Sequence, residues 1–532
     1  MNTIKSLGAM LDCSRDAVYT KETLKEFFAL LSEMGYTNVQ LYTEDTFEVK
    51  GEPYFGYLRG RYSKSELKEL DRFASENGLE LIPCIQTLAH LGGITRWDEY
   101  RPYTDIDDIL LIGEERTYTL IENMFKTCAE CFTSRRINIG MDEAHMVGLG
   151  KYLDKHGFTD RLTLLSEHLR RVLSIAKKYG FRPMMWSDMF FRLVNGGTYG
   201  MGGENLLPEH AEALVPEGID LIYWDYDGKD EAHYKSMISA HRKLKRNVVF
   251  AGGVWSWSGF VPDNDFAIQV SETAMRACIA EGVEDIFFTC WKDDGAESSL
   301  LSSLPALMCA AEFARGNFDR ESIAAKFYQI TGISFEDFMS IGKMNLKKKN
   351  ILANPCKYML YSDPFLGIFD LTVREEKQTF ADIAKDLQNL SGGKFGYMFD
   401  TLSALCRVME IKYTLGVKTR AAYEKGDKKA LTGIIGDYTE LEKRLLDFYE
   451  KFRTQWGWEC KQNGFEKHDI RIGGLLLRIR DCYRILQDYC DGKIAGIEAL
   501  EERILPFRPN DLPKKVTYYN DWMSTAMIKP KM

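Results

Sequence analysis

The feature that most constrains the fold of this chain is a unit that repeats through its first 300 residues. Each unit has an amphipathic helix, a short turn, and an apolar strand that ends in polar residues. In the first helix Leu24, Phe27, Leu31 and Met34 recur at helical spacing, and Gly35 follows as a left-handed cap. Eight strands that alternate with eight helices predict a (β/α)₈ barrel, an α/β fold in which all strands run parallel. The predicted strands are residues 7–11, 38–42, 79–85, 137–139, 182–185, 220–223, 248–251 and 285–289.

Polar and aromatic side chains gather directly after these strands. In a (β/α)₈ barrel the active site lies at the C-terminal ends of the strands. The barrel would therefore bring residues that are far apart in the sequence around one mouth. They are Arg15, Glu44, His90, Asp142, Glu143, Trp186, Trp224, Tyr226, Trp255 and Asp293.

The strand pattern stops at about Phe318, and the rest of the chain has helical periodicity. We therefore predict two domains, a catalytic barrel over residues 1–317 and an α-helical C-terminal domain over residues 318–532. Predicted helices in the second domain are 323–330, 335–344, 394–415, 418–452 and 470–489. The segment 455–474, with Trp456, Trp458, Asp469 and Arg471, has two readings. It supplies core and surface residues, which we favour, or it reaches the barrel mouth.

Composition excludes several classes of partner. The net charge of −9, with no basic block, argues against nucleic acid and anionic membranes as partners. No apolar run is long enough to span a bilayer, and residues 1–11 look like a first strand, not a signal peptide. The 12 cysteines are scattered, with a single Cys-x-x-Cys at Cys128 and Cys131 in a helical pattern. Reduced thiols in a cytoplasm are the expectation.

The fourth strand runs into Gly140, Met141, Asp142 and Glu143. Adjacent residues on a regular strand point to opposite faces, so both carboxylates face one pocket only where the backbone turns. Burying such a pair is costly unless each group is hydrogen-bonded or neutral, which suggests chemistry. The plain alternative is that Asp142 caps the next helix.

The aromatic residues point to a carbohydrate. Tryptophan offers a flat apolar face and one N–H donor, and three tryptophans follow strands five, six and eight. Arg15 and Asp293 suit vicinal hydroxyls, although either could instead form a plain salt bridge. With eight histidines and no His-Glu-x-x-His motif we expect no metal, and no phosphate-binding glycine loop suggests a cofactor.

These residues resemble glycoside hydrolase family 20, the β-N-acetylhexosaminidases, over about residues 5–315. Gly140-Met141-Asp142-Glu143 is similar to the family's Gly-x-Asp-Glu, and Trp291-Lys292-Asp293 is a supporting match. Arg15, His90 and Trp186 are further supporting matches. The chain starts at strand one without the small α+β domain of many members. It therefore looks like the shorter intracellular branch that includes hexosaminidase D.

The resemblance implies substrate-assisted retaining hydrolysis. Asp142 would orient the substrate's acetamido N–H and stabilise an oxazolinium ion, and Glu143 would act as general acid and then base. Glu44 and His90 would form a carboxylate–histidine relay, with Asp45 as an alternative carboxylate. Arg15 and Asp293 would hold the O3, O4 and O6 side of the sugar. The acetamido methyl would be boxed by Trp186, Trp224 and Trp291.

One feature departs from the family. Many members carry Tyr-x-Asp after strand seven, whereas this strand ends Val254-Trp255-Ser256-Trp257. Tyr226, one strand earlier, is the candidate for the missing hydroxyl.

The prediction is an exo-acting β-N-acetylhexosaminidase that removes terminal N-acetylglucosamine, with N-acetylgalactosamine as a second substrate, from a small oligosaccharide or glycoconjugate. The alternatives are a retaining glycosidase with a conventional carboxylate nucleophile and a sugar-binding barrel without catalysis. A helical second domain also makes a homodimer plausible.

Overall fold

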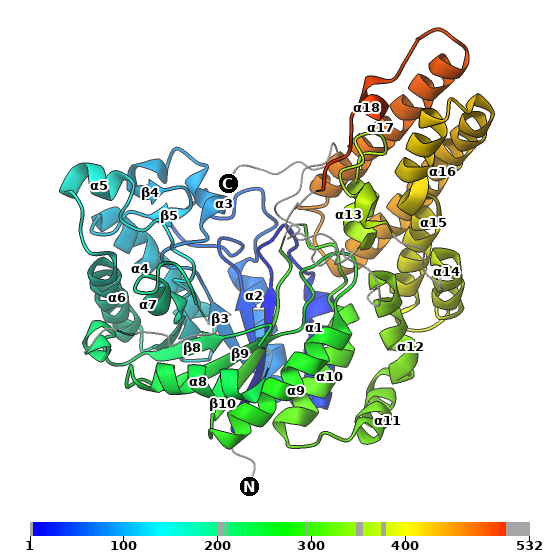
Figure 1. The fold of residues 1–532 in the computed structure, drawn as a ribbon. Coiled ribbons are helices and arrows are strands. Elements are labelled where there is room, and N and C mark those ends of the chain that lie inside the picture. The colour runs from blue at the N-terminus through cyan, green and yellow to red at the C-terminus, as the bar shows by residue number, and fades with distance from the viewer. Residues whose placement is uncertain are drawn as a thin grey trace.

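The computed structural model describes residues 4–506 except 200–206, 208–209, 229, 294, 347–354 and 374–378. Eight parallel strands close into a barrel in the order β1-β10-β9-β8-β7-β6-β3-β2, as the sequence predicts (Figure 1). The barrel strands are β1 (Ser6–Asp12), β2 (Asn38–Tyr42), β3 (Glu80–Cys84), β6 (Arg136–Asn138), β7 (Arg182–Trp186), β8 (Asp220–Trp224), β9 (Val248–Gly253) and β10 (Asp285–Cys290). Each predicted strand overlaps one of these. The parallel direction brings the residues after all eight strands to one end of the barrel.

Helices between the strands form the outer layer of the barrel. The main ones are α1 (Lys21–Met34), α2 (Lys64–Glu76), α4 (Glu115–Cys131), α6 (Arg161–Lys178), α8 (Glu231–Arg242), α9 (Asn264–Ala280) and α10 (Leu304–Ala314). Gly35 ends α1 at φ 83°, and Ser63 with Glu66 forms the capping box that begins α2. The connection from β7 to β8 is less regular. Its described residues hold only the five-residue α7 (Asp188–Arg192) and the short 3-10 helix η2 (Ala211–Leu214).

Short elements extend the C-terminal end of the barrel. After β3 the chain forms α3 (Gly92–Thr95), the 3-10 helix η1 (Arg101–Tyr103) and the hairpin of β4 (Thr104–Ile106) and β5 (Ile109–Leu110). After β6 it forms α5 (Lys151–His156). In Figure 1 these elements lie together at the upper left. They form one side of the barrel mouth.

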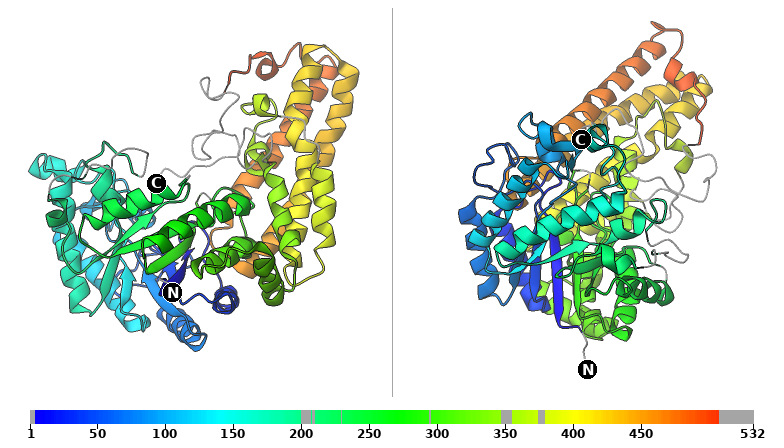
Figure 2. Two further views of the ribbon diagram at one scale, coloured as in Figure 1. Left: turned by 60° about the horizontal axis from the view of Figure 1, so that its bottom comes forward. Right: turned by 90° about the vertical axis from the view of Figure 1, so that its left-hand side faces the viewer.

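The region after the barrel is helical. Its elements are α11 (Arg320–Thr331), α12 (Phe335–Met339), η4 (Ser340–Asn345), α13 (Pro355–Tyr361), η5 (Asp370–Thr372), α14 (Phe380–Asn389), α15 (Gly396–Glu424), α16 (Lys428–Glu459), α17 (Glu466–Cys490) and α18 (Glu498–Glu501). The last three long helices, α15, α16 and α17, pack along one another and rise beside the barrel mouth (Figures 1 and 2).

One predicted boundary in this region is wrong. The sequence suggested a break between residues 415 and 418, but α15 continues to Glu424. The break comes at Gly426, which adopts φ 63°, followed by Asp427, whose side chain accepts from the backbone N–H of Ala430 as an N-cap. Gly416 stays inside α15 because it packs closely against Asp370 and the backbone of Pro364.

Two apolar clusters hold the molecule together. The larger surrounds the barrel and continues into the helical region, and the smaller fills the barrel interior. The interior cluster contains Met10, Tyr42, Cys84, Met184, Trp186, Ile222, Val249, Ala251, Phe287 and Trp291. Trp224, Tyr226 and Trp257 pack on it, so the top of the barrel core is also the floor of the mouth.

The cysteines contribute packing and not cross-links. All 12 are free thiols, and 11 of them are buried. Cys128 and Cys131 lie on α4 within the larger core cluster. Among the described residues, no helix combines the length and apolar character needed to cross a membrane.

Candidate active site

The turn after β6 brings two carboxylates to the same side. Gly140, Met141 and Glu143 adopt φ values of 71°, 69° and 51°, which are left-handed conformations. The strand alternation is thereby broken, and Asp142 and Glu143 both line one cavity at the barrel mouth. Asp142 does not cap the next helix, as the alternative interpretation required. That helix, α5, begins only at Lys151 and has Gly150 as its N-cap residue.

Gln86, the second residue after β3, clamps this turn. Its Oε1 accepts from the backbone N–H of Met141 at 3.1 Å, and its Nε2 donates to Asp142 Oδ1 at 2.8 Å. A Cβ on Gly140 would overlap the Gln86 side chain. Glycine is therefore required at position 140 both by its φ and by this close approach.

Asp142 forms a buried ion pair with His90. The side chain of Asp142 is 11% exposed, and its Oδ2 lies 3.1 Å from His90 Nε2. Burial opposes the charge on His90, but the Asp142 carboxylate raises the pKa of the imidazole to about 10. Burial alone would raise the pKa of Asp142, yet the charge of His90 and the bond from Gln86 bring it below its usual value. The pair is thus imidazolium and carboxylate at neutral pH.

Glu143 is more open than its neighbour. Its side chain is 41% exposed and lies 3.8 Å from His90 Nε2 and 3.7 Å from Arg192 Nη2. Its backbone N–H donates to Asp188 Oδ2 at 3.2 Å, and the same oxygen accepts from Arg192 Nε at 3.0 Å. Burial, and then the nearby Asp142 carboxylate, raise the pKa of Asp188 to about 7. Asp188 therefore fixes both the backbone of Glu143 and the arginine beside it. We call Gln86, His90, Asp142 and Glu143 the carboxylate side of the pocket.

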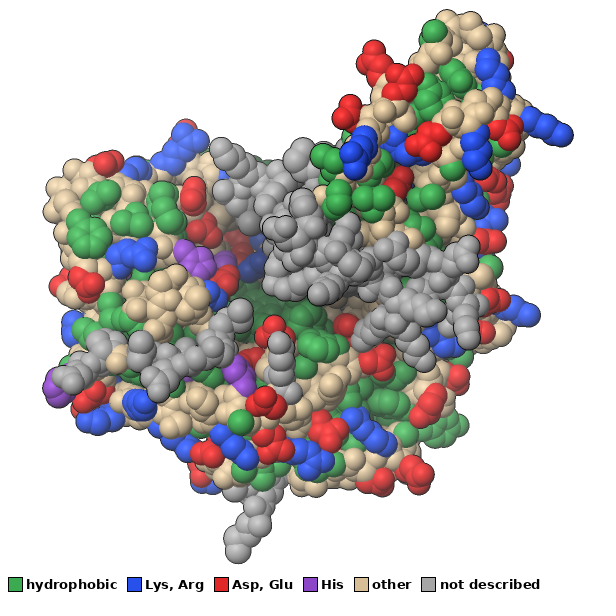
Figure 3. Space-filling model, viewed as in Figure 1, with side chains coloured by type: hydrophobic (Ala, Val, Ile, Leu, Met, Phe, Trp, Pro, Cys, Tyr) green, Lys and Arg blue, Asp and Glu red, His purple; other side chains and the backbone are tan. Residues whose placement is uncertain are grey.

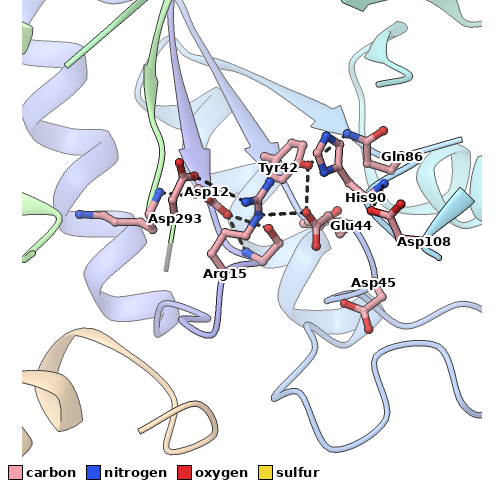
Figure 4. Close-up of polar contacts among 12 residues, drawn as sticks. Asp12, Arg15, Tyr42, Glu44, Asp45, Gln86, His90, Asp108 and Asp293 are labelled. Carbon is pink, nitrogen blue, oxygen red and sulfur yellow. Dashed lines mark hydrogen bonds and ion pairs between the residues drawn. The ribbon is translucent and has the colours of Figure 1, made fainter. Parts of the chain in front are cut away.

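The opposite side is built on Arg15. Its Nε donates to Glu44 Oε1 at 3.1 Å, and its Nη1 lies 3.6 Å from Asp293 Oδ1. Tyr42 adds a hydrogen bond to Glu44 Oε1 at 3.0 Å. Figure 4 shows Arg15 between the two carboxylates, with Asp45 apart from them. Arg15, Glu44 and Asp293 are called the arginine side below.

Aromatic rings close the pocket between these two sides. The cavity has a volume of about 190 Å³. This is below the range typical of sites for drug-sized ligands, so it suits a small unit such as one sugar ring. Trp186 and Trp291 lie 5.9 Å apart, and Trp291 Nε1 donates to the Tyr226 hydroxyl at 2.8 Å. Figure 3 shows a hollow on this face with hydrophobic side chains at its base. The lining residues are Arg15, His90, Asp142, Glu143, Trp186, Trp224, Tyr226, Trp257, Trp291 and Asp293.

Two predicted contact residues do not line the cavity. Glu44 is 7% exposed and lies behind Arg15. Trp255 packs against Trp257 with ring centroids 4.9 Å apart, and its Nε1 donates to the carbonyl of Tyr226 at 2.6 Å. Trp257, two residues further along, supplies the ring that faces the cavity.

His90, the histidine of the predicted carboxylate–histidine relay, pairs with a different carboxylate. Asp142, and neither Glu44 nor Asp45, forms the ion pair with His90. Asp45 instead forms an ion pair with Arg59 at 3.3 Å. Glu44 is committed to Arg15 and Tyr42.

Sequence reasoning missed five residues that complete the site. Four of them could have been found from their position, since Gln86, Asp188 and Trp257 all follow predicted strands, and Tyr42 ends β2. Arg192 carried no such signal, because it lies six residues beyond the end of β7 and reaches Glu143 through α7. Among the described residues, no group of three or more His, Cys, Asp or Glu side chains is arranged to hold a metal ion.

Two protein-family models match the chain. The model for "Glycosyl hydrolase family 20, catalytic domain" matches residues 8–230, and the model for "Glycoside Hydrolase 20C C-terminal domain" matches residues 336–518. The first match contains the two carboxylates, and the second lies in the helical region. The protein is therefore a glycoside hydrolase. Its chain belongs to glycoside hydrolase family 20.

The chain is also similar to individual proteins and to solved structures. Hexosaminidase D of Homo sapiens is 25% identical over 357 residues, which is 62% of this chain and 70% of that protein. Hexosaminidase D of Bos taurus is 24% identical over 352 residues, which is 60% of this chain and 94% of that protein. Among solved structures, the family 20 β-N-acetylhexosaminidase of Streptomyces coelicolor A3(2) aligns with a TM-score of 0.45 at 17% identity, over 62% of this chain and 69% of that one.

Proposed function

We propose that this enzyme is an exo-β-N-acetylhexosaminidase that works through substrate-assisted retaining catalysis. The observation that carries the proposal is the pairing of Asp142 with His90 beside Glu143 at the mouth of the barrel. An ionised, immobilised carboxylate next to a more exposed one suits two different roles. Family membership supports the same activity.

In this proposal Asp142 acts on the 2-acetamido group of the substrate. Its carboxylate accepts a hydrogen bond from the acetamido N–H, so that the carbonyl oxygen faces C1. That oxygen forms a bond to C1 as the bond from C1 to the leaving oxygen breaks, which gives an oxazolinium ion. The negative charge of Asp142, kept by His90 and Gln86, stabilises the positive ring.

Glu143 handles the proton. It donates its proton to the leaving oxygen, and later takes one from the water that attacks C1 and reopens the ring with retained configuration. The 41% exposure of its side chain supports this role, since leaving group and water must both reach it.

The remaining lining residues would hold the sugar. Arg15 and Asp293 suit the ring hydroxyls, because both present polar atoms to the cavity. Trp186, Trp224 and Trp291 would enclose the acetamido methyl. The Tyr226 oxygen accepts the N–H of Trp291, which leaves its own proton for the acetamido carbonyl.

The proposal also includes the exo mode of action and the cellular compartment. A cavity of about 190 Å³ favours one terminal sugar over an internal stretch of glycan, hence an exo-acting enzyme. Twelve free cysteines favour a reducing compartment such as the cytoplasm.

The test uses p-nitrophenyl β-glycosides with and without a 2-acetamido group, and a thiazoline mimic of the oxazolinium ion as inhibitor. We expect cleavage of the 2-acetamido substrates alone and inhibition by the thiazoline. Cleavage of plain glucosides or galactosides that the thiazoline does not inhibit would indicate a conventional carboxylate nucleophile. If the protein binds these sugars and cleaves none, the barrel is a binding module and the proposal is wrong.

A further inference from the structure

The turn between α16 and α17, residues 459–467, reaches from the helical region to the barrel mouth. It contacts the loop from β1 to α1, which carries Arg15, and the loop from β10 to α10, which carries Trp291 and Asp293. These two loops supply most of the arginine side of the pocket. Figure 1 shows the lower ends of α16 and α17 beside the barrel, and Figure 4 shows the arginine side itself.

The contacts to the first loop are mainly between backbones. Lys461 N–H donates to the carbonyl of Val18 at 2.7 Å, and Thr20 N–H donates to the carbonyl of Glu459 at 3.0 Å. Gly464 adopts φ 101°, and a Cβ there would overlap the carbonyl of Asp16. These backbone hydrogen bonds join residues 16–20 to the turn in the way that hydrogen bonds join two neighbouring strands.

A side-chain ion pair then fixes the residue next to Arg15. Lys467 Nζ contacts Asp16 Oδ2, and the two side chains are 18% and 22% exposed. Asp16 adopts φ 74°, an unfavourable conformation for a residue other than glycine. The ion pair offsets that cost and holds the backbone from which Arg15 projects.

Glu459 holds the second loop. Glu459 is 4% exposed, and its carboxylate accepts from Ser299 Oγ at 2.6 Å and from the backbone N–H of Leu300 at 3.2 Å. Tyr397 on α15 donates to the same carboxylate at 3.0 Å. Burial would favour the neutral acid, and burial does raise the pKa of Glu459 despite these donors. Burying an acid of this kind is costly unless it is hydrogen-bonded, and the bonds to the second loop meet that requirement.

A buried charge cluster reinforces the second loop. Glu297, 1% exposed at its side chain, lies 2.9 Å from Lys357 and 3.4 Å from Arg471. His468 Nε2 lies 2.8 Å from the carbonyl of Gly295. His468 and Arg471, the two residues of α17 that contact this loop, therefore lie within a few residues of Lys467. Of the two readings of the segment 455–474, the favoured one, core and surface, holds for Trp456, which is 4% exposed. The turn formed by residues 459–467 of the same segment reaches the barrel mouth.

We propose that Lys467 and Glu459 are positioning residues for the sugar-binding arginine side, so that the helical region is part of the active site. The two anchored loops meet where Arg15 faces Asp293 at 3.6 Å and Trp291 at 5.9 Å. The turn thereby fixes the position of the two loops relative to each other without contacting the substrate. This inference deepens the proposed function and rests on Arg15 as a sugar contact.

The experiment measures kcat and KM for Lys467→Met and Glu459→Gln on the p-nitrophenyl glycoside that the parent cleaves best. We expect kcat/KM to fall on the order of ten-fold for each, because a small displacement of a positioning group is costly. The fall should come mainly through KM, and Lys467→Arg should restore most of it. Lys451→Met is the matched control, since Lys451 on α16 pairs with Asp400 on α15 at 2.8 Å, an ion pair of the helical region with side chains 26% and 32% exposed.

A double-mutant cycle separates positioning from general destabilisation. In an Arg15→Gln background, Lys467→Met should change kcat/KM less than two-fold, because its effect passes through Arg15. If the losses from Lys467→Met and Arg15→Gln simply multiply, or if Lys451→Met causes the same loss, the inference is wrong. Should Lys467→Met not fold, Asp16→Asn removes the same ion pair and carries the same expectation. A parent that cleaves no 2-acetamido substrate overturns the proposed function instead, and the cycle is then read on whichever glycoside it does cleave.

Discussion

Both sides of the pocket are built from barrel residues, but the carboxylate side is held within the barrel, whereas the loops of the arginine side are also held by the helical region. On the carboxylate side, Gln86 and His90 follow β3, and Asp142 and Glu143 follow the adjacent strand β6. Their positions depend on a tight backbone turn and on bonds between neighbouring strands. On the arginine side, the loops that carry Arg15 and Asp293 are fastened by residues more than 150 positions later in the chain.

The difference separates two requirements of a glycosidase. The groups that meet the reacting bond must be rigid, and left-handed turns supported by a buried ion pair provide this. In the proposed function, the groups that recognise the sugar ring lie on longer loops, which contacts from the helical region hold in place.

The largest effect should follow loss of Glu143, the proposed proton donor. Glu143→Gln should lower turnover of an unactivated disaccharide by roughly 10²- to 10⁴-fold, since protonation of the leaving oxygen is lost. The loss should be smaller for a p-nitrophenyl glycoside, whose leaving group needs little protonation. Steady-state rates on both substrates and equilibrium binding of the sugar product check this. Near-parental turnover of the disaccharide would remove Glu143 from the role of general acid.

Breaking the ion pair on the carboxylate side should alter the pH dependence. In His90→Gln the pKa of Asp142 rises, so the acidic limb of kcat/KM should move upward by about one to three pH units. His90 has its folded pKa raised to about 10, so its contribution to stability is complete below its unfolded value and is lost as pH rises through about 10.

The same variant gives a stability readout. Denaturant unfolding of parent and His90→Gln at several pH values should show a difference that shrinks between neutral pH and pH 10. The exposed His156→Gln is the control and should give no such trend. A stability difference that stays constant with pH would show that His90 is not charged in the native pair.

On the arginine side a smaller loss is expected. Arg15→Lys keeps the charge but cannot reach Glu44 and Asp293 together, because lysine lacks the planar fork. We expect kcat/KM to fall about ten-fold, chiefly through KM, as one or two charge-assisted hydrogen bonds are lost. Arg116→Lys is the control. Arg116 forms an ion pair with Glu52 at 2.7 Å, and this pair lies outside the pocket. A loss confined to kcat would place Arg15 with the reacting groups and erase the contrast between the two sides.

Most of the fold follows from local patterns in the sequence. The barrel strands, the Ser63–Glu66 capping box and the cap at Gly35 were predictable because each depends on residues close in the chain. The grouping of site residues was predictable for a different reason, since parallel strands bring all of their C-terminal ends together.

The pairing of those residues was not predictable, and the backbone explains why. Glu44, His90, Glu143 and Trp255 all have positive φ, at 44°, 56°, 51° and 53°. A left-handed residue at a strand end re-aims the side chains around it, so spacing no longer tells which of them face the cavity. His90 thus meets Asp142, and Trp257 replaces Trp255. The links from the helical region could not be predicted for a simpler reason, because most of them join residues more than 150 positions apart in the sequence.

The smallest effect concerns these two tryptophans. Trp257 lines the cavity, whereas Trp255 packs behind it and bonds the carbonyl of Tyr226. Trp257→Phe should reduce kcat/KM several-fold by removing part of an aromatic wall. Trp255→Phe should change kcat/KM less than about three-fold and lower the free energy of unfolding by about 1 kcal/mol, the worth of one hydrogen bond. Kinetics and denaturant unfolding of both variants check the ranking. The reverse ranking would mean that Trp255 swings into the pocket when substrate binds, and that a wall of this site, unlike its carboxylates, is set by the ligand.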